Sequence, residues 1–460
     1  MRTRVAQRLF HSRAAHTEWV KRVVRSRKAR PPQLVESTAA APFLREVEPM
    51  YDRLRCFAAP DGALPEHSPS ASLVEAEYPL ATDAQLRKNV ADMHAWSPFR
   101  LSKFYEALDA LTGDAAYRHV NAGVKRGEPE LTLVTAGHYH SLKLGKTVPG
   151  RNASLRCYVT GTGSSTVEVR TDGLQADDNG VERLVNVCHT IMVALDARTM
   201  TPVKGSVAPL RADDPADDAH QEERAALAAL HKALRQKREH EAMGLRGRIS
   251  HPPTAAEMAA VHELHRAVAL RAERPQEERR RDDGGGGGRP DTMAYHTHTS
   301  CFVAFPEQRN VHGKLFGGWV TGTAFDIAYY AARFFVRGRP FVPLGLDEAA
   351  FLQPVAIGDM VRFEARVVHA ADAIFRVAVR VGVVEASDPA RLARRTNRLM
   401  FVFATDRAAH DASTVLPETY QEVLLQVEAA RRHAVEGPNE RTWSELDRHF
   451  REEAAREPLW

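Results

Sequence analysis

The chain has 460 residues, with 63 Lys+Arg against 59 Asp+Glu and a formal net charge of +4. A single hydrophobic core rarely grows beyond about 250–300 residues, so this length predicts two or three domains. With 43% hydrophobic and 27% charged residues, the composition is globular and excludes collagen-like, coiled-coil and wholly disordered chains. Four scattered cysteines exclude a disulfide framework and a CxxC zinc site. No apolar run reaches the roughly 20 residues that span a bilayer.

Residues 1–30 hold ten basic side chains and a single acid, Glu18. Apolar Val5, Leu9 and Phe10 alternate with arginines at roughly helical spacing, which is typical of a mitochondrial transit peptide. A basic arm that binds RNA or a protein partner is the alternative. Without this segment, 53 Lys+Arg remain against 58 Asp+Glu. The folded body is therefore mildly acidic, and no nucleic-acid partner is expected.

Residues 31–75 contain proline and serine with weak periodicity, and we interpret them as a linker or a wrapping segment. Residues 76–210 predict an α+β domain, because apolar residues recur at helical spacing from Leu101 to Ala115. Four strands are predicted after this helix, at Leu131–Val134, Leu155–Val159, Val167–Arg170 and Leu184–Leu195.

Residues 211–292 are richer in charged residues than the domain before them. Gln221–Glu241 and Ala255–Ala272 are charged segments that read as helices. Gly284–Gly288 is a run of five glycines, which favours a flexible loop between domains.

The pattern of the first domain returns in residues 293–408. A glycine-rich turn leads into a predicted helix, Gly318–Val336, and alternating strands follow at Val361–Val367, Phe375–Val383 and Leu399–Phe403. One long helix followed by an antiparallel meander thus occurs twice, which predicts a duplicated α+β unit with a sheet around each helix. Residues 409–460 are predicted to be a C-terminal extension, with helices at Tyr420–Ala430 and Thr442–Ala455.

Two motifs in the second repeat carry a resemblance to a known family. Asn310-Val-His-Gly-Lys-Leu-Phe-Gly-Gly318 resembles the N-x-x-G-x-x-F-G-G signature of hotdog-fold acyl-CoA thioesterases. Phe351-Leu-Gln-Pro-Val-Ala-Ile-Gly-Asp359 resembles their F-x-x-P-V-x-x-G-D turn. The chain is more closely similar to the mitochondrial acyl-coenzyme A thioesterase 9 type, which carries two hotdog repeats and a presequence. The resemblance covers roughly residues 76–408.

This resemblance implies hydrolysis of acyl-CoA thioesters to free acid and CoA in the mitochondrial matrix, without a cofactor or a metal, by a homo-oligomer. An alternative is a catalytically inactive hotdog protein that serves as a subunit or an acyl-CoA-binding component of a mitochondrial assembly. The alternative is motivated by the first repeat, which has Arg100, Leu101 and Ser102 near the turn where the second repeat has its Gly-Gly pair.

Thioester hydrolysis requires a carboxylate that activates water or attacks the carbonyl, and donors for the developing oxyanion. Gly317 and Gly318 open the second helix, whose N-terminal N–H groups are such donors. Asp326 in this helix and Asp109 in the first helix are the candidate catalytic residues, by resemblance to double-hotdog thioesterases. The alternative for each is a solvated helix residue or a member of an ion pair.

Other residues are candidates for substrate binding. Asn310 and His312 precede the second helix and either contact the thioester or shape the turn. Arg394 and Arg395 lie just before the last strand and either bind the phosphates of coenzyme A or act as surface charges.

Two His-x-His pairs, His138/His140 and His296/His298, would each face one way from a strand. No cysteine or acid is spaced to complete a metal site with them, so no metal is expected. Asp347 is expected to brace the strand after the second helix by accepting backbone or side-chain donors.

Overall fold

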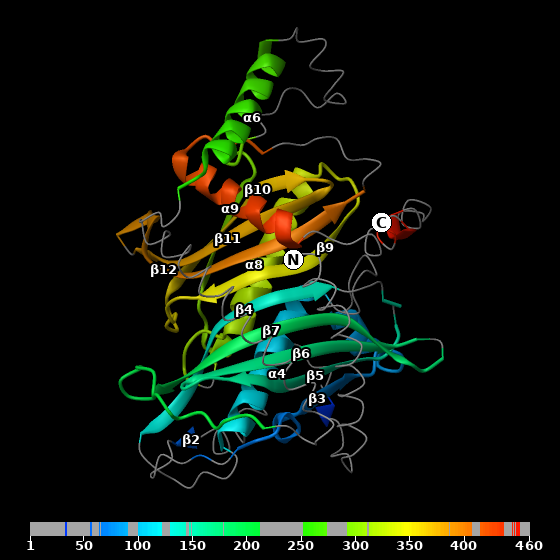
Figure 1. The fold of residues 1–460 in the computed structure, drawn as a ribbon, viewed down its shortest axis with the longest axis vertical. Coiled ribbons are helices and arrows are strands. Elements are labelled where there is room, and N and C mark those ends of the chain that lie inside the picture. The colour runs from blue at the N-terminus through cyan, green and yellow to red at the C-terminus, as the bar shows by residue number, and fades with distance from the viewer. Residues whose placement is uncertain are drawn as a thin grey trace. The chain divides into compact units, whose positions relative to one another are not determined.

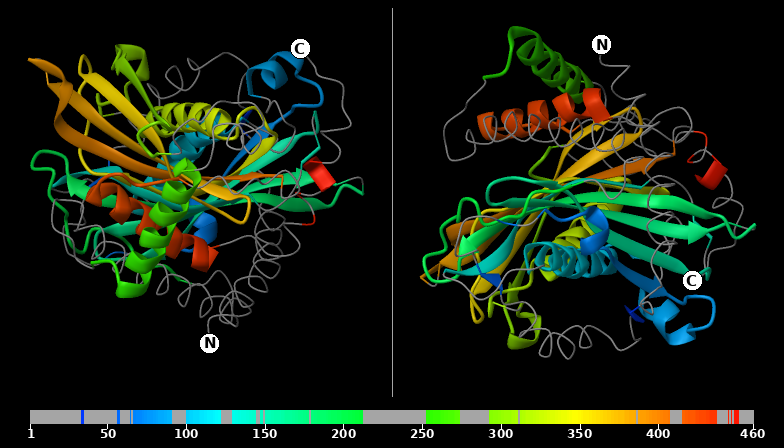
Figure 2. Two further views of the ribbon diagram at one scale, coloured as in Figure 1. Left: turned by 90° about the horizontal axis from the view of Figure 1, so that it is seen from above. Right: turned by 60° about the horizontal axis from the view of Figure 1, so that its bottom comes forward.

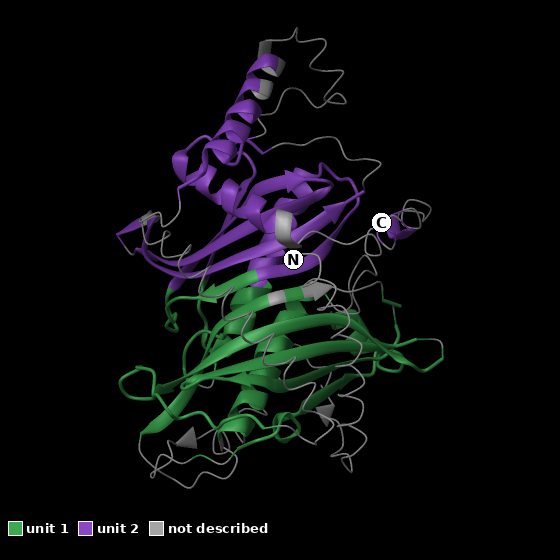
Figure 3. Ribbon diagram, in the orientation of Figure 1, with its two compact units in different colours: residues 1–235, 303–322, 348–359 green, residues 236–302, 323–347, 360–460 purple. Residues whose placement is uncertain are grey.

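The computed structural model of the chain falls into two compact units (Figure 3). It describes residues 33–34, 56–57, 64, 66–90, 100–121, 129–143, 147–148, 150–177, 179–211, 252–273, 292–310, 312–385, 387–406, 415–436, 444, 446 and 448–450. Unit 1 comprises residues 1–235, 303–322 and 348–359, and unit 2 comprises residues 236–302, 323–347 and 360–460. The predicted transit segment 1–30, the Gln221–Glu241 helix, the Gly284–Gly288 run and most of Thr442–Ala455 lie outside the described residues.

Unit 1 is an antiparallel sheet with one long helix (Figure 1). Its elements are β1 (Gln33–Leu34), β2 (Cys56–Phe57), η1 (Pro69–Ser72), β3 (Val74–Tyr78), α3 (Ala84–Val90), α4 (Leu101–Asn121), β4 (Glu130–Lys143), β5 (Ala153–Thr162), β6 (Thr166–Ala176), β7 (Glu182–Asp196) and η4 (Pro306–Gln308). The strand order is β1-β3-β5-β6-β7-β4, with β2 paired to β4. The pairs are antiparallel, except that β1 runs parallel to β3.

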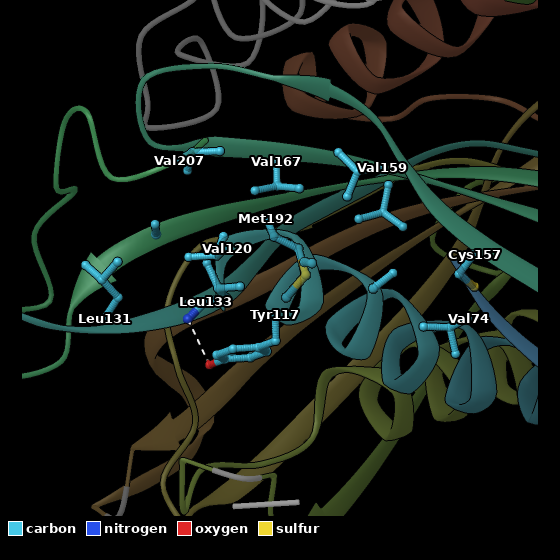
Figure 4. Close-up of a cluster of buried hydrophobic side chains, with 14 residues drawn as sticks. Val74, Tyr117, Val120, Leu131, Leu133, Cys157, Val159, Val167, Met192 and Val207 are labelled. Atoms are coloured by element: carbon cyan, nitrogen blue, oxygen red, sulfur yellow. Dashed lines mark hydrogen bonds between the residues drawn. The ribbon is translucent and has the colours of Figure 1, made fainter. Parts of the chain in front are cut away.

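The core of unit 1 forms where α4 lies along one face of this sheet (Figure 2). Apolar residues at helical spacing, among them Phe104, Tyr105 and Leu108, are at most 2% exposed. Figure 4 shows the cluster around the second half of the helix, in which Tyr117 accepts a hydrogen bond from the Leu133 N–H at 3.0 Å. This packing fixes the position of α4, and with it the polar residue Asp109, relative to the strands.

Unit 2 repeats this plan. It contains α6 (Ala255–Glu273), β8 (Thr297–Val303), β10 (Met360–Ala371), β11 (Ile374–Glu385), β12 (Asp388–Thr405) and α9 (Tyr420–Glu436). Helix α8 (Gly317–Phe335) begins in unit 1 and continues in unit 2, whereas β9 (Phe341–Phe351) begins in unit 2 and ends in unit 1. The strand order is β9-β12-β11-β10-β8.

The two repeats have the same topology. In the first, β3 precedes the helix and the order is β3-β5-β6-β7-β4; in the second, β8 precedes the helix and the order is β8-β10-β11-β12-β9. Each of these five-strand sets therefore has one strand before its helix and four after it, in the same sheet positions, and the short β1 and β2 are additions to the first repeat. The predicted duplicated α+β fold is confirmed.

The core of unit 2 is aromatic. Phe375 and Phe403 stack with ring centroids 5.4 Å apart, and Phe325 meets Phe401 edge to face at 5.6 Å. A buried ion pair lies in the same unit, where Arg376 Nε donates to Asp347 Oδ2 at 2.9 Å.

The ion pair is almost completely shielded from water. The Arg376 and Asp347 side chains are 1% and 2% exposed. Asp347 thus braces β9 by accepting a hydrogen bond from Arg376 of β11, as expected from the sequence.

The C-terminal extension packs on the sheet of unit 2. Helix α9 contacts β10, where Arg366 Nη1 lies 2.6 Å from Glu422 Oε1. Helix α6 lies beside α9 (Figure 2), and Arg431 Nε lies 2.6 Å from Glu257 Oε1. Val261 of α6 packs against two valines of α9. The helices predicted at Ala255–Ala272 and Tyr420–Ala430 are confirmed as α6 and α9. Among the described helices, none is long and apolar enough to cross a membrane.

The structure contains elements that the sequence did not predict, among them α3 and β8, and two of the differences have a clear account. The segment 31–75 contributes β1 and β2 and the first residues of β3, in which Val74 pairs with Cys157 of β5. Strand β9 was not predicted, because its first nine residues are all buried and show no alternation of polar and apolar side chains.

Candidate active site

A buried carboxylate lies near the middle of α4. The Asp109 side chain is 7% exposed and points toward β4, where Thr135 Oγ1 donates a hydrogen bond to Asp109 Oδ1 at 2.9 Å. A carboxylate in such a place is costly unless donors compensate for the lost water. The surroundings of Asp109 supply further contacts from β4 itself and from the N-terminus of α8.

A β-bulge brings a second residue of β4 to the same carboxylate. Thr135 pairs with Met192 and Gly137 with the adjacent Ile191, so Ala136 is an extra residue in β4. Side chains three positions apart on a regular strand point to opposite faces. The bulge reverses this alternation, and both Thr135 and His138 face Asp109.

His138 is completely buried beside Asp109. Its Nε2 atom lies 3.7 Å from Asp109 Oδ1, and its Nδ1 atom is hydrogen-bonded to Thr190 Oγ1 at 2.9 Å. The ring also meets Phe351 edge to face, with centroids 5.5 Å apart. Burial lowers the pKa of His138 to about 3, so the imidazole is neutral.

The N-terminus of α8 supplies the third contact. The Gly318 N–H donates a hydrogen bond to the Asp109 carboxylate. The first N–H groups of a helix have no acceptor within the helix and carry its positive dipole end, so they favour an anion. Burial nevertheless outweighs these donors and raises the pKa of Asp109 from 3.8 to about 6, while Thr135 and Gly318 act in the opposite direction.

Glycines allow α8 to approach α4 this closely. A Cβ atom on Gly318 would lie 2.9 Å from the Cα of Glu106, and one on Gly322 would lie 2.8 Å from the carbonyl oxygen of Ser102. The two contacts are one helical turn apart on both helices, so the first turns of α8 lie directly against α4. Gly317 faces the carboxylate itself, since its Cβ would lie 2.9 Å from Asp109 Oδ2.

Asn310 and His312 hold the turn before α8. The Asn310 side-chain oxygen accepts hydrogen bonds from the N–H groups of His312 at 2.9 Å and Lys314 at 3.0 Å. The His312 ring contacts Thr132 Oγ1 at 3.0 Å and the Tyr117 hydroxyl at 3.3 Å. Tyr117 lies two turns beyond Asp109 on α4, which is about 12 Å along the helix. His312 is thus anchored further along α4 than the carboxylate.

The second candidate carboxylate has different surroundings. Asp326 is exposed and lies nine residues after Gly317, about 13 Å along α8, so it does not share the helix N-terminus with Asp109.

The two candidate arginines lie in unit 2. Arg394 is half-buried and Arg395 is exposed; they pair with Val383 and Gly382 where the register between β11 and β12 shifts. They belong to a different unit from Asp109.

At least one histidine of each His-x-His pair contacts protein side chains. Across the described ranges, no three His, Cys, Asp or Glu side chains converge where they could hold a metal ion. His138 faces Asp109, and the His298 ring lies 4.9 Å from that of Tyr330, measured between centroids. Sequence reasoning therefore found Asp109, Gly317 and Gly318 but missed Thr135 and the place of His138.

The chain is similar to known thioesterases. The family model described as Thioesterase superfamily matches residues 312–383. Acyl-coenzyme A thioesterase 9, mitochondrial, from Bos taurus is 24% identical over 372 residues, which cover 80% of this chain and 78% of that protein. Acyl-coenzyme A thioesterase 10, mitochondrial, from Mus musculus is 24% identical over 80% of this chain and 78% of its own length. Acyl-coenzyme A thioesterase 2, chloroplastic, from Humulus lupulus is 25% identical over 71% and 69%.

The fold and the site define a class of protein. Two repeats of one topology, each with a long helix against an antiparallel sheet, are the double-hotdog fold, and a buried carboxylate meets a Gly-Gly helix N-terminus. The chain has this fold, its residues 312–383 match the Thioesterase superfamily, and it is similar to the mitochondrial acyl-CoA thioesterase 9 type over most of its length.

Proposed function

We propose that this chain hydrolyses acyl-CoA thioesters to free acid and CoA, with Asp109 as its catalytic carboxylate. One observation carries the assignment: the buried Asp109 carboxylate accepts a hydrogen bond from the Gly318 N–H at the N-terminus of α8. A carboxylate beside a set of backbone donors is the pair of groups that acyl transfer to water requires.

The two carboxylate oxygens of Asp109 have different surroundings. Oδ1 accepts from Thr135 and lies near His138, whereas Oδ2 is directed toward Gly317. We assign Oδ2 as the base that takes a proton from the attacking water. The N–H groups of the first turn of α8 stabilise the oxyanion that forms when the water oxygen bonds to the thioester carbon.

The intermediate collapses when the carbon–sulfur bond breaks and the electron pair leaves with the sulfur of CoA. The proton that Asp109 took from water is returned to this thiolate, so Asp109 ends the cycle ionised. A pKa of about 6 suits the role, because the group is ionised near neutral pH and still accepts a proton readily.

The other predicted residues receive supporting roles in this proposal. Asn310 and His312 hold the turn that precedes α8, and so set the position of the Gly317 and Gly318 N–H groups. Arg394 and Arg395 are proposed to bind the phosphates of CoA, because guanidinium groups form strong, bidentate bonds with phosphate. Asp326 is proposed as the carboxylate of a second, separate site.

Thiol release from a panel of acyl-CoA substrates of increasing chain length tests the assignment. Asp109→Asn preserves size and is expected to lose at least about 100-fold in kcat. Asp326→Asn is the matched variant; it removes part of the activity if both carboxylates work and none if Asp109 works alone. Wild-type protein that releases no thiol at any chain length would contradict the proposal and support the non-catalytic subunit.

We further propose that the protein acts in the mitochondrial matrix as a homo-oligomer. The basic, acid-poor composition of residues 1–30 and the mitochondrial relatives support the location. A fluorescent protein fused to residues 1–30 is expected to reach the matrix, whereas one in which the arginines of this segment are changed to glutamine is not. Sedimentation of the full chain measures the assembly, and a monomeric mass would contradict it.

A further inference from the structure

A buried imidazole nitrogen faces the carboxylate without a hydrogen-bond partner. His138 is 0% exposed, and Nε2 has no acceptor or donor within hydrogen-bond distance. Asp109 Oδ1 lies 3.7 Å from this nitrogen. A buried polar atom left unpaired costs free energy, so its retention in a well-packed site calls for a physical reason.

We propose that His138 is a positioning residue for Asp109, with its Nε2–H directed at Oδ1 so that Oδ2 stays turned toward the first turn of α8. The inference rests on the proposed function, because it assigns Oδ2 as the base. Thr135 donates to the same Oδ1 atom at 2.9 Å. One bonded donor and a second N–H directed at the same oxygen restrict the rotation of the carboxyl group about its Cβ–Cγ bond and distinguish the two oxygens.

The contacts of the ring decide which nitrogen carries the proton. A neutral imidazole has one N–H and one lone pair. If Nδ1 carried the proton, the Nε2 lone pair would face a carboxylate oxygen 3.7 Å away in a buried site, which is repulsive. The reverse arrangement, in which the Thr190 hydroxyl donates to Nδ1 at 2.9 Å, places the Nε2–H toward Asp109.

The surrounding structure prevents the ring from turning away. Phe351 covers one edge of the ring at 5.5 Å between centroids, and the bulge at Ala136 sets the direction of the side chain. The next residue back, Gly137, lies so close to β9 that a Cβ atom would be 2.5 Å from the Ala349 carbonyl oxygen. The backbone that carries His138 is therefore confined between two strands.

The distance of 3.7 Å is longer than a hydrogen bond, as expected of a site without substrate. Hydrogen bonds in catalytic sites are often long in the free enzyme and shorten in the complex. The other charged groups nearby on α4 are Glu106 and Lys103, which pair with each other at 2.8 Å. Thr135 and Gly318 lower the pKa of Asp109, and His138 is proposed as a third group that acts in the same direction.

The test compares His138→Phe, which keeps a ring and removes both nitrogens, with His138→Gln, whose amide can still donate. His262→Gln on the exposed face of α6 is the matched control. In His138→Phe the acid limb of kcat/KM is expected to move up by about one pH unit, because the ionised carboxylate loses a donor. We expect kcat to fall about tenfold with KM unchanged, and His138→Gln to recover part of both.

A purely structural role for His138 gives a different result. In that case His138→Phe would lower the melting temperature and leave the acid limb where it is, which would overturn the proposal. Nitrogen NMR of the wild-type imidazole supplies a readout that needs no activity: an Nε2 without a proton would also overturn it.

The proposal can be separated from the function on which it rests. If wild-type protein hydrolyses no acyl-CoA, the proposed function fails, but the carboxyl pKa of Asp109 can still be followed by carbon NMR. This pKa is expected to rise in His138→Phe and to stay unchanged in His262→Gln. An unchanged value in His138→Phe would refute the contact itself.

Discussion

The missing side chain of Gly317 leaves the room that the Asp109 carboxylate occupies. A Cβ atom on Gly317 would lie 2.9 Å from Asp109 Oδ2 and 3.0 Å from the Phe351 ring. The first distance is shorter than real Cβ atoms show and the second is tighter than most, so the carboxylate has to shift and the ring has to give slightly. The position of the carboxylate relative to α8 therefore depends on this glycine.

Gly317→Ala is expected to lower kcat about tenfold or more, because a small displacement of a catalytic group costs much of its effect. Gly113→Ala is the matched control on α4, since a Cβ there meets nothing within 4 Å. The control is expected to keep its activity and to gain about 0.5–1 kcal/mol of stability, as alanine is the better helix former. Equal activities of the two variants would show that the carboxylate tolerates the extra methyl group.

The raised pKa of Asp109 predicts how stability depends on pH. Burial raises it from 3.8 to about 6, so the folded protein is penalised for ionising this group above pH 6. Well below pH 3.8 the carboxyl is protonated in both the folded and the unfolded chain, and the penalty disappears. Asp109→Asn is therefore expected to stabilise the protein at pH 8 by up to about 3 kcal/mol, with most of this gain lost at pH 4.

Denaturant unfolding of the wild type and the Asn variant at pH 4, 6 and 8 measures this difference. A variant that is less stable than wild type at pH 8 would contradict the direction of the shift. The same variant is inactive under the proposed function, so stability and activity are expected to change in opposite directions.

The hydrogen bond from Thr135 is expected to matter for catalysis more than for folding. Thr135→Val removes the donor to Asp109 Oδ1 and keeps the shape of the side chain. A bond to a charged acceptor contributes about 1.5–3 kcal/mol, so kcat is expected to fall at least about tenfold. Thr135→Ser retains the hydroxyl and should stay close to wild type; similar losses in both variants would assign the effect to packing instead.

The buried ion pair between Arg376 and Asp347 predicts that its removal strongly lowers the stability of the protein. Arg376→Met leaves the carboxylate of Asp347 buried without its partner and is expected to cost about 3–5 kcal/mol. Arg380→Met, four residues along β11, breaks the more exposed pair with Glu364 and should cost about 1 kcal/mol or less. Replacing Asp347 with Leu in the Arg376→Met background should recover part of the loss, as measured by chemical unfolding.

Most of the fold follows from the periodic spacing of apolar residues in the sequence. The spacing of Leu101, Phe104 and Leu108 predicts α4, and the alternation in β10 and β11 predicts strands, because one face of each is buried and the other is not. Strand β9 breaks the rule, since continuous burial removes the alternation on which the prediction depends.

The site was only partly accessible from the sequence. Asp109 and the Gly-Gly pair carry recognisable motifs, but Thr135 and His138 are brought together by a bulge at Ala136. On a regular strand, residues three apart point to opposite faces, so the sequence grouped His138 with His140, for which no metal was expected, and not with Thr135. Local irregularities of this kind depend on long-range pairing with β7 and leave no signal in the periodicity.

The fusion of two repeats into one chain has an evolutionary consequence. In a protein built from two identical single-repeat subunits, every substitution is made twice, so neither helix terminus can change without the other. Here the Gly317–Gly318 terminus keeps the glycines that contact Asp109, while Arg100–Ser102 stands near the corresponding turn of the first repeat. Covalent linkage thus allows one helix terminus to change while the other keeps its sequence.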